Sequence, residues 1–306
     1  MISSLNPSAE LFLSDLSMVQ SQINTAERQV SSGLKISQPS DAPDQLGSLM
    51  QIHAELDQNA QVTTNLSVVK TETDTAESAL ETATQLLDQA TSLASQGANT
   101  TETAGARQAL AQQVTNILQQ MVGLSQSAVN GRFIFSGDEP QQPSYQLDLA
   151  APNGVDRLIT PTATRQIVDA TGISFTVAHT AQDIFDHRNL NDSVASDNVF
   201  GALNSLLVSL QNNDQAGVTN SIDSLHQAAT YLSTQLSFYG SVQDRIAGAT
   251  SFAASQQVQL QTSLSQTQDA DITQAALQLT QSTTQMNAAL SAEAKLPRTS
   301  LFDFLA

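Results

Sequence analysis

The side chains best suited to chemistry in this sequence are four histidines and the carboxylates near them. The histidines are scattered, without the spacing of metal ligands: His53, His179, His187 and His226. No zinc-protease, nucleophile-elbow, phosphate-loop or calcium-loop pattern occurs. Asp183, Asp186 and His187 lie close enough in sequence to suggest a metal site, but we interpret them as a solvated turn beside a strand region. We therefore predict no catalytic residue, no metal site and no cofactor, and we expect that the chain is not an enzyme.

The amino-acid composition also favours a non-enzymatic protein built of long helices. The 306 residues include no cysteine, which excludes disulfides and thiolate chemistry, and no tryptophan, with aromatic residues at only 4%. Acidic residues outnumber basic ones by 29 to 11, and the three lysines are far apart. Nucleic acid and anionic membranes select clustered cations, so we expect neither as a partner. Few aromatics suit long helices that meet along narrow seams.

A heptad pattern of apolar residues runs along the first segment. Its members are Leu5, Ala9, Phe12, Leu16, Val19, Ile23, Ala26 and Val30. Asn6 and Pro7 suit a helix start, and Gly33 ends the pattern. Asp41 is predicted to cap a second helix that reaches about Gln96, roughly 80 Å at 1.5 Å per residue.

Three further helical stretches follow. A third helix is predicted from about Leu110 to Ala128, and after the middle of the chain a short helix covers Val199 to Leu210. A last heptad stretch runs from Val218 to Leu290, before Pro297.

The middle of the chain loses the helical period. Residues 145–149 and 173–177 alternate apolar and polar side chains, which is typical of strands. Pro152, Asn153 and Gly154 suggest a turn that joins the first of these strands to another at 155–159.

These patterns predict a mainly α fold with an inserted β domain. The N- and C-terminal halves form a long antiparallel coiled-coil-like helical rod, and the small β-rich domain lies at its tip. We divide the chain into an N-terminal helix and break (1–40), the two halves of the helical rod (41–137 and 193–259), the β insert (138–192), and a C-terminal helix and tail (260–306).

The two ends carry the functional signal. Strong seams at both termini, together with the apolar tail Leu301, Phe302, Phe304 and Leu305, suit a subunit that buries its ends in neighbours. The first twenty residues have none of the features of a secretory signal peptide, and no apolar run reaches membrane-spanning length. Any export would therefore use another route.

Three short motifs resemble the bacterial flagellin superfamily. Ser31-Ser32-Gly33-Leu34-Lys35-Ile36, followed by Ser40-Asp41-Ala42, is similar to the family's break after its first helix. Asn130-Gly131-Arg132-Phe133-Ile134-Phe135-Ser136-Gly137 resembles a motif of the hook–filament junction proteins in this family, and so does the ending Ser300-Leu301-Phe302-Asp303-Phe304-Leu305. The resemblance covers about 1–137 and 197–306, and Pro43 departs from the family pattern.

The resemblance implies a structural subunit that joins hook to filament. Such a chain is cytoplasmic before the flagellar type III system exports it unfolded, and it then forms a ring between a hook-side junction protein and filament flagellin. An export chaperone holds the C-terminal segment, around Leu301, Phe302, Phe304 and Leu305. In the polymer core we expect Leu5, Phe12, Leu16, Val19 and Ile23 to pack against Leu279, Met286 and Leu290.

Two other functions fit the sequence. A short filament flagellin would share the fold but form the bulk polymer, and the Arg132–Gly137 motif and the ending argue against it. A secreted helical adhesin or effector would bind a ligand through the β insert and would remain a stable monomer.

Overall fold

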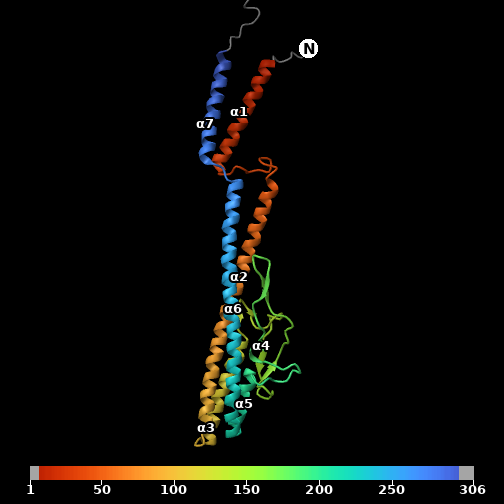
Figure 1. Cartoon of the computed structure of the whole chain (residues 1–306), viewed down its shortest axis with the longest axis vertical. Helices are drawn as coiled ribbons and strands as arrows, with labels where there is room; N and C mark the ends of the chain where they lie inside the picture. Colours follow the sequence, from red (N-terminus) through yellow and green to blue (C-terminus); the bar gives the residue numbers. More distant parts are fainter. Residues whose placement is uncertain (1–6, 296–306) are drawn as a thin grey trace, which may run out of the picture. The chain divides into compact units, whose positions relative to one another are not determined.

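The computed structural model describes residues 7–295, and most of them are helical (Figure 1). The elements in chain order are α1 (Pro7–Ser32), α2 (Leu46–Gly97), α3 (Ala104–Ser125), β1 (Ala128–Val129), β2 (Arg132–Phe133), β3 (Tyr145–Leu147), β4 (Val155–Arg157), β5 (Gln166–Val168), β6 (Ser174–Thr176), α4 (Ala181–Phe185), α5 (Val199–Gln211), α6 (Gln215–Gln268) and α7 (Ile272–Lys295). The chain divides into two compact units, one of residues 1–58 with 256–306 and one of residues 59–255. We call them the terminal unit and the central unit.

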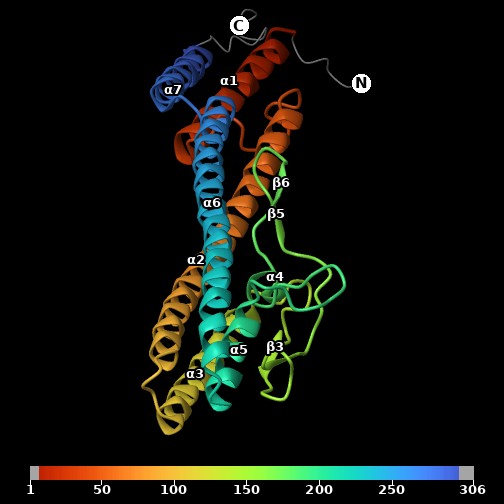
Figure 2. The same ribbon diagram turned by 60° about the horizontal axis from the view of Figure 1, so that its bottom comes forward.

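In the central unit α2 and α6 run antiparallel along each other, while α3 packs on α5 (Figures 1 and 2). The side-chain amide of Asn59 in α2 donates to the carbonyl of Ala253 in α6 at 2.8 Å, and Gln215 at the start of α6 donates to Ala98 just beyond α2. These hydrogen bonds join helices that are far apart in the sequence into one bundle. The predicted helices are present with three differences: α2 begins at Leu46, α3 ends at Ser125 rather than Ala128, and the last heptad stretch is divided into α6 and α7.

Three two-stranded antiparallel hairpins make up the β part: β1–β2, β3–β4 and β5–β6. The predicted pairing of 145–149 with 155–159 is confirmed, since Tyr145 pairs with Arg157 and Leu147 with Val155. The link between these strands is a longer loop, because Asp148 donates to Gly154 and Gly154 to Ala151.

The β part lies along the side of the helical bundle, whereas the sequence placed it at the tip (Figure 2). Its apolar side chains explain this position. Ile167 and Phe175 pack with Leu66, Val69 and Val242 of the long helices. One face of the β5–β6 hairpin is buried on this flank, while Val168 on the other face stays exposed. The hairpin needs such a flank because a two-stranded sheet has no core of its own.

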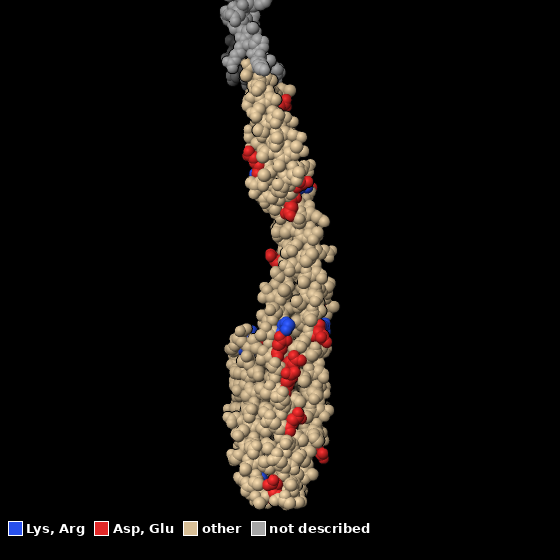
Figure 3. All heavy atoms as spheres, turned by 90° about the vertical axis from the view of Figure 1, so that its left-hand side faces the viewer, with Lys and Arg blue, Asp and Glu red and all other residues tan. Residues whose placement is uncertain are grey.

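The core of the central unit contains five buried aromatic side chains: Phe135, Tyr145, Phe185, Phe200 and Tyr239. Phe135 meets the rings of Phe185 and Tyr239 edge-on, with centroids 5.8 and 6.4 Å apart, and Tyr145 packs on Phe200. Figure 3 shows that acidic side chains outnumber basic ones on the face drawn. Among the described residues, no helix is long and apolar enough to cross a membrane.

Candidate assembly surface

The terminal unit pairs α1 with α7 as antiparallel helices. The α1 side of the seam has Phe12, Leu16 and Val19 half-buried, and Ile23 and Ala26 buried at 9% and 2% exposure. These positions recur at three- and four-residue steps, so they lie along one stripe of the helix. Leu5 lies outside the described residues.

The α7 side of this seam is made of smaller residues. Ala275 and Ser282 are buried, Leu279 and Met286 are half-buried, and Leu290 is 49% exposed. The structure thus brings the predicted residues of α1 and α7 onto two paired helices but leaves Leu290 largely open. The seam between two helices covers only part of each apolar stripe.

Other apolar side chains of the same helices face solvent. In α1 these are Leu11, Leu13 and Met18, and in α7 Ile272 and Leu277, all between 45% and 68% exposed. The chain from Ile272 to Ala292 carries no charged residue. Large apolar side chains on an uncharged helix favour burial against another surface.

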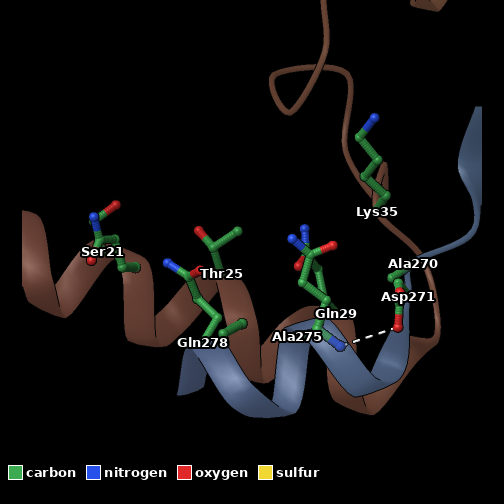
Figure 4. A pocket seen from close by; sticks show the side chains of 11 residues that line it. Ser21, Thr25, Gln29, Lys35, Ala270, Asp271, Ala275 and Gln278 are labelled. Atoms are coloured by element: carbon green, nitrogen blue, oxygen red, sulfur yellow. Dashed lines mark hydrogen bonds between the residues drawn. The ribbon is translucent and has the colours of Figure 1, made fainter. Parts of the chain in front are cut away.

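A shallow groove of about 410 Å³ runs between α1 and α7 (Figure 4). Amide side chains line much of it: Gln22, Gln29, Gln274 and Gln278. Lys35 and Asp271 stand at one end, and the Asp271 carboxylate accepts a hydrogen bond from the backbone nitrogen of Gln274 at 3.1 Å. Asp271 therefore caps the start of α7, and the groove holds no set of groups arranged for catalysis.

In the terminal unit, the segment after α1 and the segment between α6 and α7 are both non-helical, and they lie next to each other. After Ser32, Gly33 adopts a positive φ of 73°, and its carbonyl accepts from Ala270 at 2.9 Å. Leu34 forms a β-bridge with Asp269. The first family motif, including Ser32, Gly33 and Leu34, therefore forms a joint with the segment between α6 and α7. The heptad pattern from Val218 to Leu290 did not predict the break between α6 and α7.

The predicted role of Asp41 as a helix cap is wrong. α2 begins at Leu46, and the Asp41 carboxylate instead accepts from the backbone nitrogens of Gln38 and Ser37 at 2.8 and 3.0 Å. Those backbone hydrogen bonds hold the pKa of the Asp41 carboxyl below its usual value. The side chain folds the Pro39 loop back on itself, which leaves it unavailable to the helix.

The second family motif connects α3 to the β part. Asn130 and Gly131 form the turn of the β1–β2 hairpin, where Arg132 is exposed and Phe133 half-buried. Phe135 enters the core and is fully buried, and Gly137 has a φ of 56°. The motif therefore serves packing and chain direction at the point where the helix ends.

The candidate metal residues have structural partners. Asp183 and Thr180 form a capping box on α4. Asp186 is fully buried, so the prediction of a solvated turn is wrong there: its carboxylate accepts from Tyr145, Asn153, Arg188 and Asn198 at 2.8 to 3.0 Å. His187 pairs with Asp197 at 2.6 Å. Within residues 7–295 no group of three or more potential metal ligands occurs.

The remaining histidines hold structural or solvent positions. The ring of His179 stacks on Phe238 at a centroid distance of 3.8 Å, while His53 and His226 are exposed on α2 and α6. The apolar tail Leu301, Phe302, Phe304 and Leu305 lies outside the described residues. The fold and this surface define a helical structural protein whose terminal helices carry exposed apolar side chains.

Comparison with protein families identifies that class. The bacterial flagellin N-terminal helical region matches residues 2–139, and the C-terminal helical region matches residues 222–305. Together the two matches cover well over half of the chain. The chain belongs to the bacterial flagellin family, and it is a structural subunit rather than an enzyme.

Solved structures of flagellar hook-associated proteins share the fold. One from Vibrio parahaemolyticus, assigned as a hook-associated protein, is 17% identical with a TM-score of 0.65, covering 75% of this chain and 100% of that one. Hook-associated protein-3 of Legionella pneumophila is 11% identical with a TM-score of 0.61, covering 71% and 98%. FlgL of Bacillus cereus is 18% identical with a TM-score of 0.54, covering 72% and 100%. A comparison with curated protein sequences gave no match.

Proposed function

We propose that the chain is a hook–filament junction protein of the bacterial flagellum, equivalent to hook-associated protein 3. The Asn130–Gly137 motif, which resembles that of junction proteins, supports this choice over filament flagellin. The similarity in fold to three hook-associated proteins, which are covered almost completely, adds to it.

The main support for assembly is that the seam between α1 and α7 in the terminal unit is incomplete. Phe12, Leu16 and Val19 remain half-buried between α1 and α7, and Leu290 is 49% exposed. A pair of helices with so little fully buried surface gains most from further helices packed around it. We propose that neighbouring subunits supply these helices in a ring, with Leu5, Ile23, Leu279 and Met286 in the same polymer core.

The polymer-core roles of 1–40 and 260–306 belong to this proposal, as do the rod segments 41–137 and 193–259 and the outer β insert 138–192. The ring lies between a hook-side junction protein and filament flagellin. The flagellar type III system exports the chain unfolded from the cytoplasm.

A cytosolic chaperone holds the C-terminal tail before export. The apolar residues Leu301, Phe302, Phe304 and Leu305 support this, because a chaperone groove recognises an amphipathic segment by its apolar side chains. Removing residues 300–306 is expected to abolish binding to the cognate export chaperone. Unchanged affinity in calorimetry would remove the chaperone from the proposal and leave the junction role standing.

Complementation tests the junction role. The gene is expressed in a bacterium that lacks its hook–filament junction protein, and motility and flagella are examined by electron microscopy. We expect restored filaments, with labelled subunits confined to a narrow zone at the distal end of the hook. Label along whole filaments, or long filaments of the purified chain alone, would identify a filament flagellin instead. A stable monomer that binds a surface ligand and restores nothing would favour the adhesin or effector function.

A further inference from the structure

Two Asn–Gly pairs occur in the sequence, Asn130–Gly131 and Asn153–Gly154. In such a pair the glycine backbone nitrogen can attack Cγ of the asparagine side chain, because glycine has no Cβ to shield it. The N–Cγ bond forms while the bond from Cγ to the amide nitrogen breaks, and ammonia leaves with the proton of the glycine nitrogen. Water then opens the succinimide at either carbonyl, which gives aspartate or isoaspartate without any oxidant.

Asn130–Gly131 is open to this reaction. Both residues are exposed at the tip of the β1–β2 hairpin, with φ values of 52° and 75°. Within residues 7–295, no hydrogen bond engages the Asn130 side chain or the Gly131 nitrogen, and a Cβ placed on Gly131 would meet nothing within 4 Å. The nucleophile and the leaving group are therefore both unrestrained.

The hairpin that holds this turn is short. Two residue pairs join its strands, Ala128 with Phe133 and Val129 with Arg132, and just beyond them the Ile134 nitrogen donates to the Ser127 carbonyl at 3.0 Å. The left-handed turn must rotate its backbone before the nitrogen reaches Cγ. Opening so short a hairpin costs little, because few hydrogen bonds and little apolar contact are lost.

Asn153–Gly154 has the same two residue types in a closed setting. Asn153 is 3% exposed, and its side-chain amide donates to Oδ1 of buried Asp186 at 2.8 Å. The Gly154 nitrogen donates to the Ala151 carbonyl at 3.0 Å. A Cβ on Gly154 would lie 2.9 Å from the Leu118 side chain, so the loop has no room to rotate. Both reacting groups are therefore engaged in other hydrogen bonds.

We propose that Asn130 is a site of spontaneous deamidation and isoaspartate formation in the folded protein, and that folding protects Asn153. The product introduces a carboxylate two residues before Arg132 in the chain. Isoaspartate also adds a methylene to the main chain of the turn that sets the pairing of Val129 with Arg132. The second family motif thus contains a chemically labile position next to its buried anchor Phe135.

The folded full-length chain, incubated in mildly alkaline buffer, provides the test. Trypsin cleaves after Arg107, Arg132 and Arg157, so the two asparagines fall in separate peptides, 108–132 and 133–157. Mass spectrometry follows deamidation of each peptide, and enzymatic methylation reports isoaspartate. We expect modification at Asn130 to be at least about tenfold faster than at Asn153, because only the latter requires unfolding of packed structure.

Two controls make the result decisive. In a urea-unfolded sample both peptides are expected to react at similar rates, since the dipeptides are the same. The variant Asn130→Gly keeps a turn compatible with positive φ and removes the reacting side chain, so isoaspartate in peptide 108–132 should disappear. An unmodified Asn130 in the folded chain, or equal rates at the two sites, would overturn the proposal.

Discussion

A single buried arginine closes one end of the central bundle. Arg107 is 5% exposed, and its guanidinium donates to the carbonyls of Gly97 and Asn99 at 2.8 and 2.9 Å and to the Asn213 side chain at 2.6 Å. Gly97 ends α2, where helical carbonyls lack partners and favour a cation. The heptad pattern marks Leu110 and Val114 but gives no sign that Arg107 turns inward.

Replacing Arg107 by alanine is expected to lower the free energy of unfolding by about 3 kcal/mol, since buried carbonyls lose a charged donor. Urea unfolding followed by circular dichroism measures this change. Gln108→Ala, on the exposed side of the same turn, is the control and should stay within about 0.5 kcal/mol of the parent. Equal stability of the two variants would show that the guanidinium does not hold the bundle end.

All three tyrosines of the chain are shielded from water to different extents. Burial raises the pKa of Tyr145, with the nearby Asp186 carboxylate adding to the effect, and burial also raises the pKa of Tyr239. Half-buried Tyr231 has its pKa raised to about 12 by burial and then by the charges of Asp183 and Asp197. A raised pKa favours the protonated folded state.

An alkaline titration is therefore expected to show no tyrosine ionising near pH 10, with Tyr231 the first to ionise, at about 12. The contribution of Tyr231 to the free energy of unfolding is fully present below pH 10 and is lost as the pH rises through 12, because its pKa is higher in the folded state. Tyrosinate absorbance reports this directly, because the chain contains no tryptophan. Tyr231→Phe should remove the first step, and a step near pH 10 in the parent would contradict the assignment.

At the scale of elements, periodicity predicted most of the helices. The seams around Phe12, Leu80 and Leu225 recur over many turns, and such repetition determines the buried face. The joint between α6 and α7 was not predictable, because residues 269–271 contain neither glycine nor proline. Their break depends on hydrogen bonds with Gly33 and Lys35 from the other end of the chain.

Short elements were harder to predict than long ones. All described strands have only two or three residues. Strands β3, β4 and β6 fall within predicted strands because longer alternating stretches surround them, whereas β5 and the β1–β2 hairpin lack a clear alternation. Asp186 was predicted to be solvated because its partners Asn153, Tyr145 and Asn198 are distant in sequence. Tertiary contacts determine both the formation of these short strands and the burial of Asp186.

Gly137, at the end of the second family motif, has a backbone conformation that favours glycine, and its neighbours leave no room for a side chain. Its φ is 56°, and a Cβ would lie 2.5 Å from the Ala163 carbonyl and 2.8 Å from Pro161. Gly137→Ala is expected to cost about 2 to 3 kcal/mol in unfolding free energy. Gly248→Ala in α6, where the Cβ would meet nothing within 4 Å, should instead stabilise by about 0.5 to 1 kcal/mol. Thermal melts that shift both variants equally would contradict this contrast.

At the scale of the whole molecule, the two units differ in how much they bury. The central unit has fully buried leucines and aromatic rings from α2, α3, α4, α5 and α6, including Leu80, Leu118, Leu203 and Phe200. In the described parts of α1 and α7, the buried side chains are Ile23, Ala26, Ala275 and Ser282, and Ile23 is the largest of them. The central unit has a core of its own, whereas the terminal helices are only partly covered.

Charged substitutions on the terminal helices are therefore expected to block assembly without unfolding the chain. Phe12→Asp and Leu290→Asp place a carboxylate in the proposed polymer core, where desolvation is costly. Complementation should fail, while the urea transition of the central unit stays unchanged. Ser40→Asp, an exposed loop position with the same added charge, should still assemble. Normal flagella from the Phe12→Asp or Leu290→Asp variant would exclude that position from the core.

Limited proteolysis of the purified monomer, with mass spectrometry of the products, tests most directly whether the terminal helices await neighbours. A protease of broad specificity is expected to remove roughly the first 30 to 40 and the last 30 to 45 residues. It should leave a resistant fragment that contains the central unit, 59–255. A chain that resists digestion from end to end would show that the α1–α7 seam is already complete in one molecule, and it would contradict assembly through these helices.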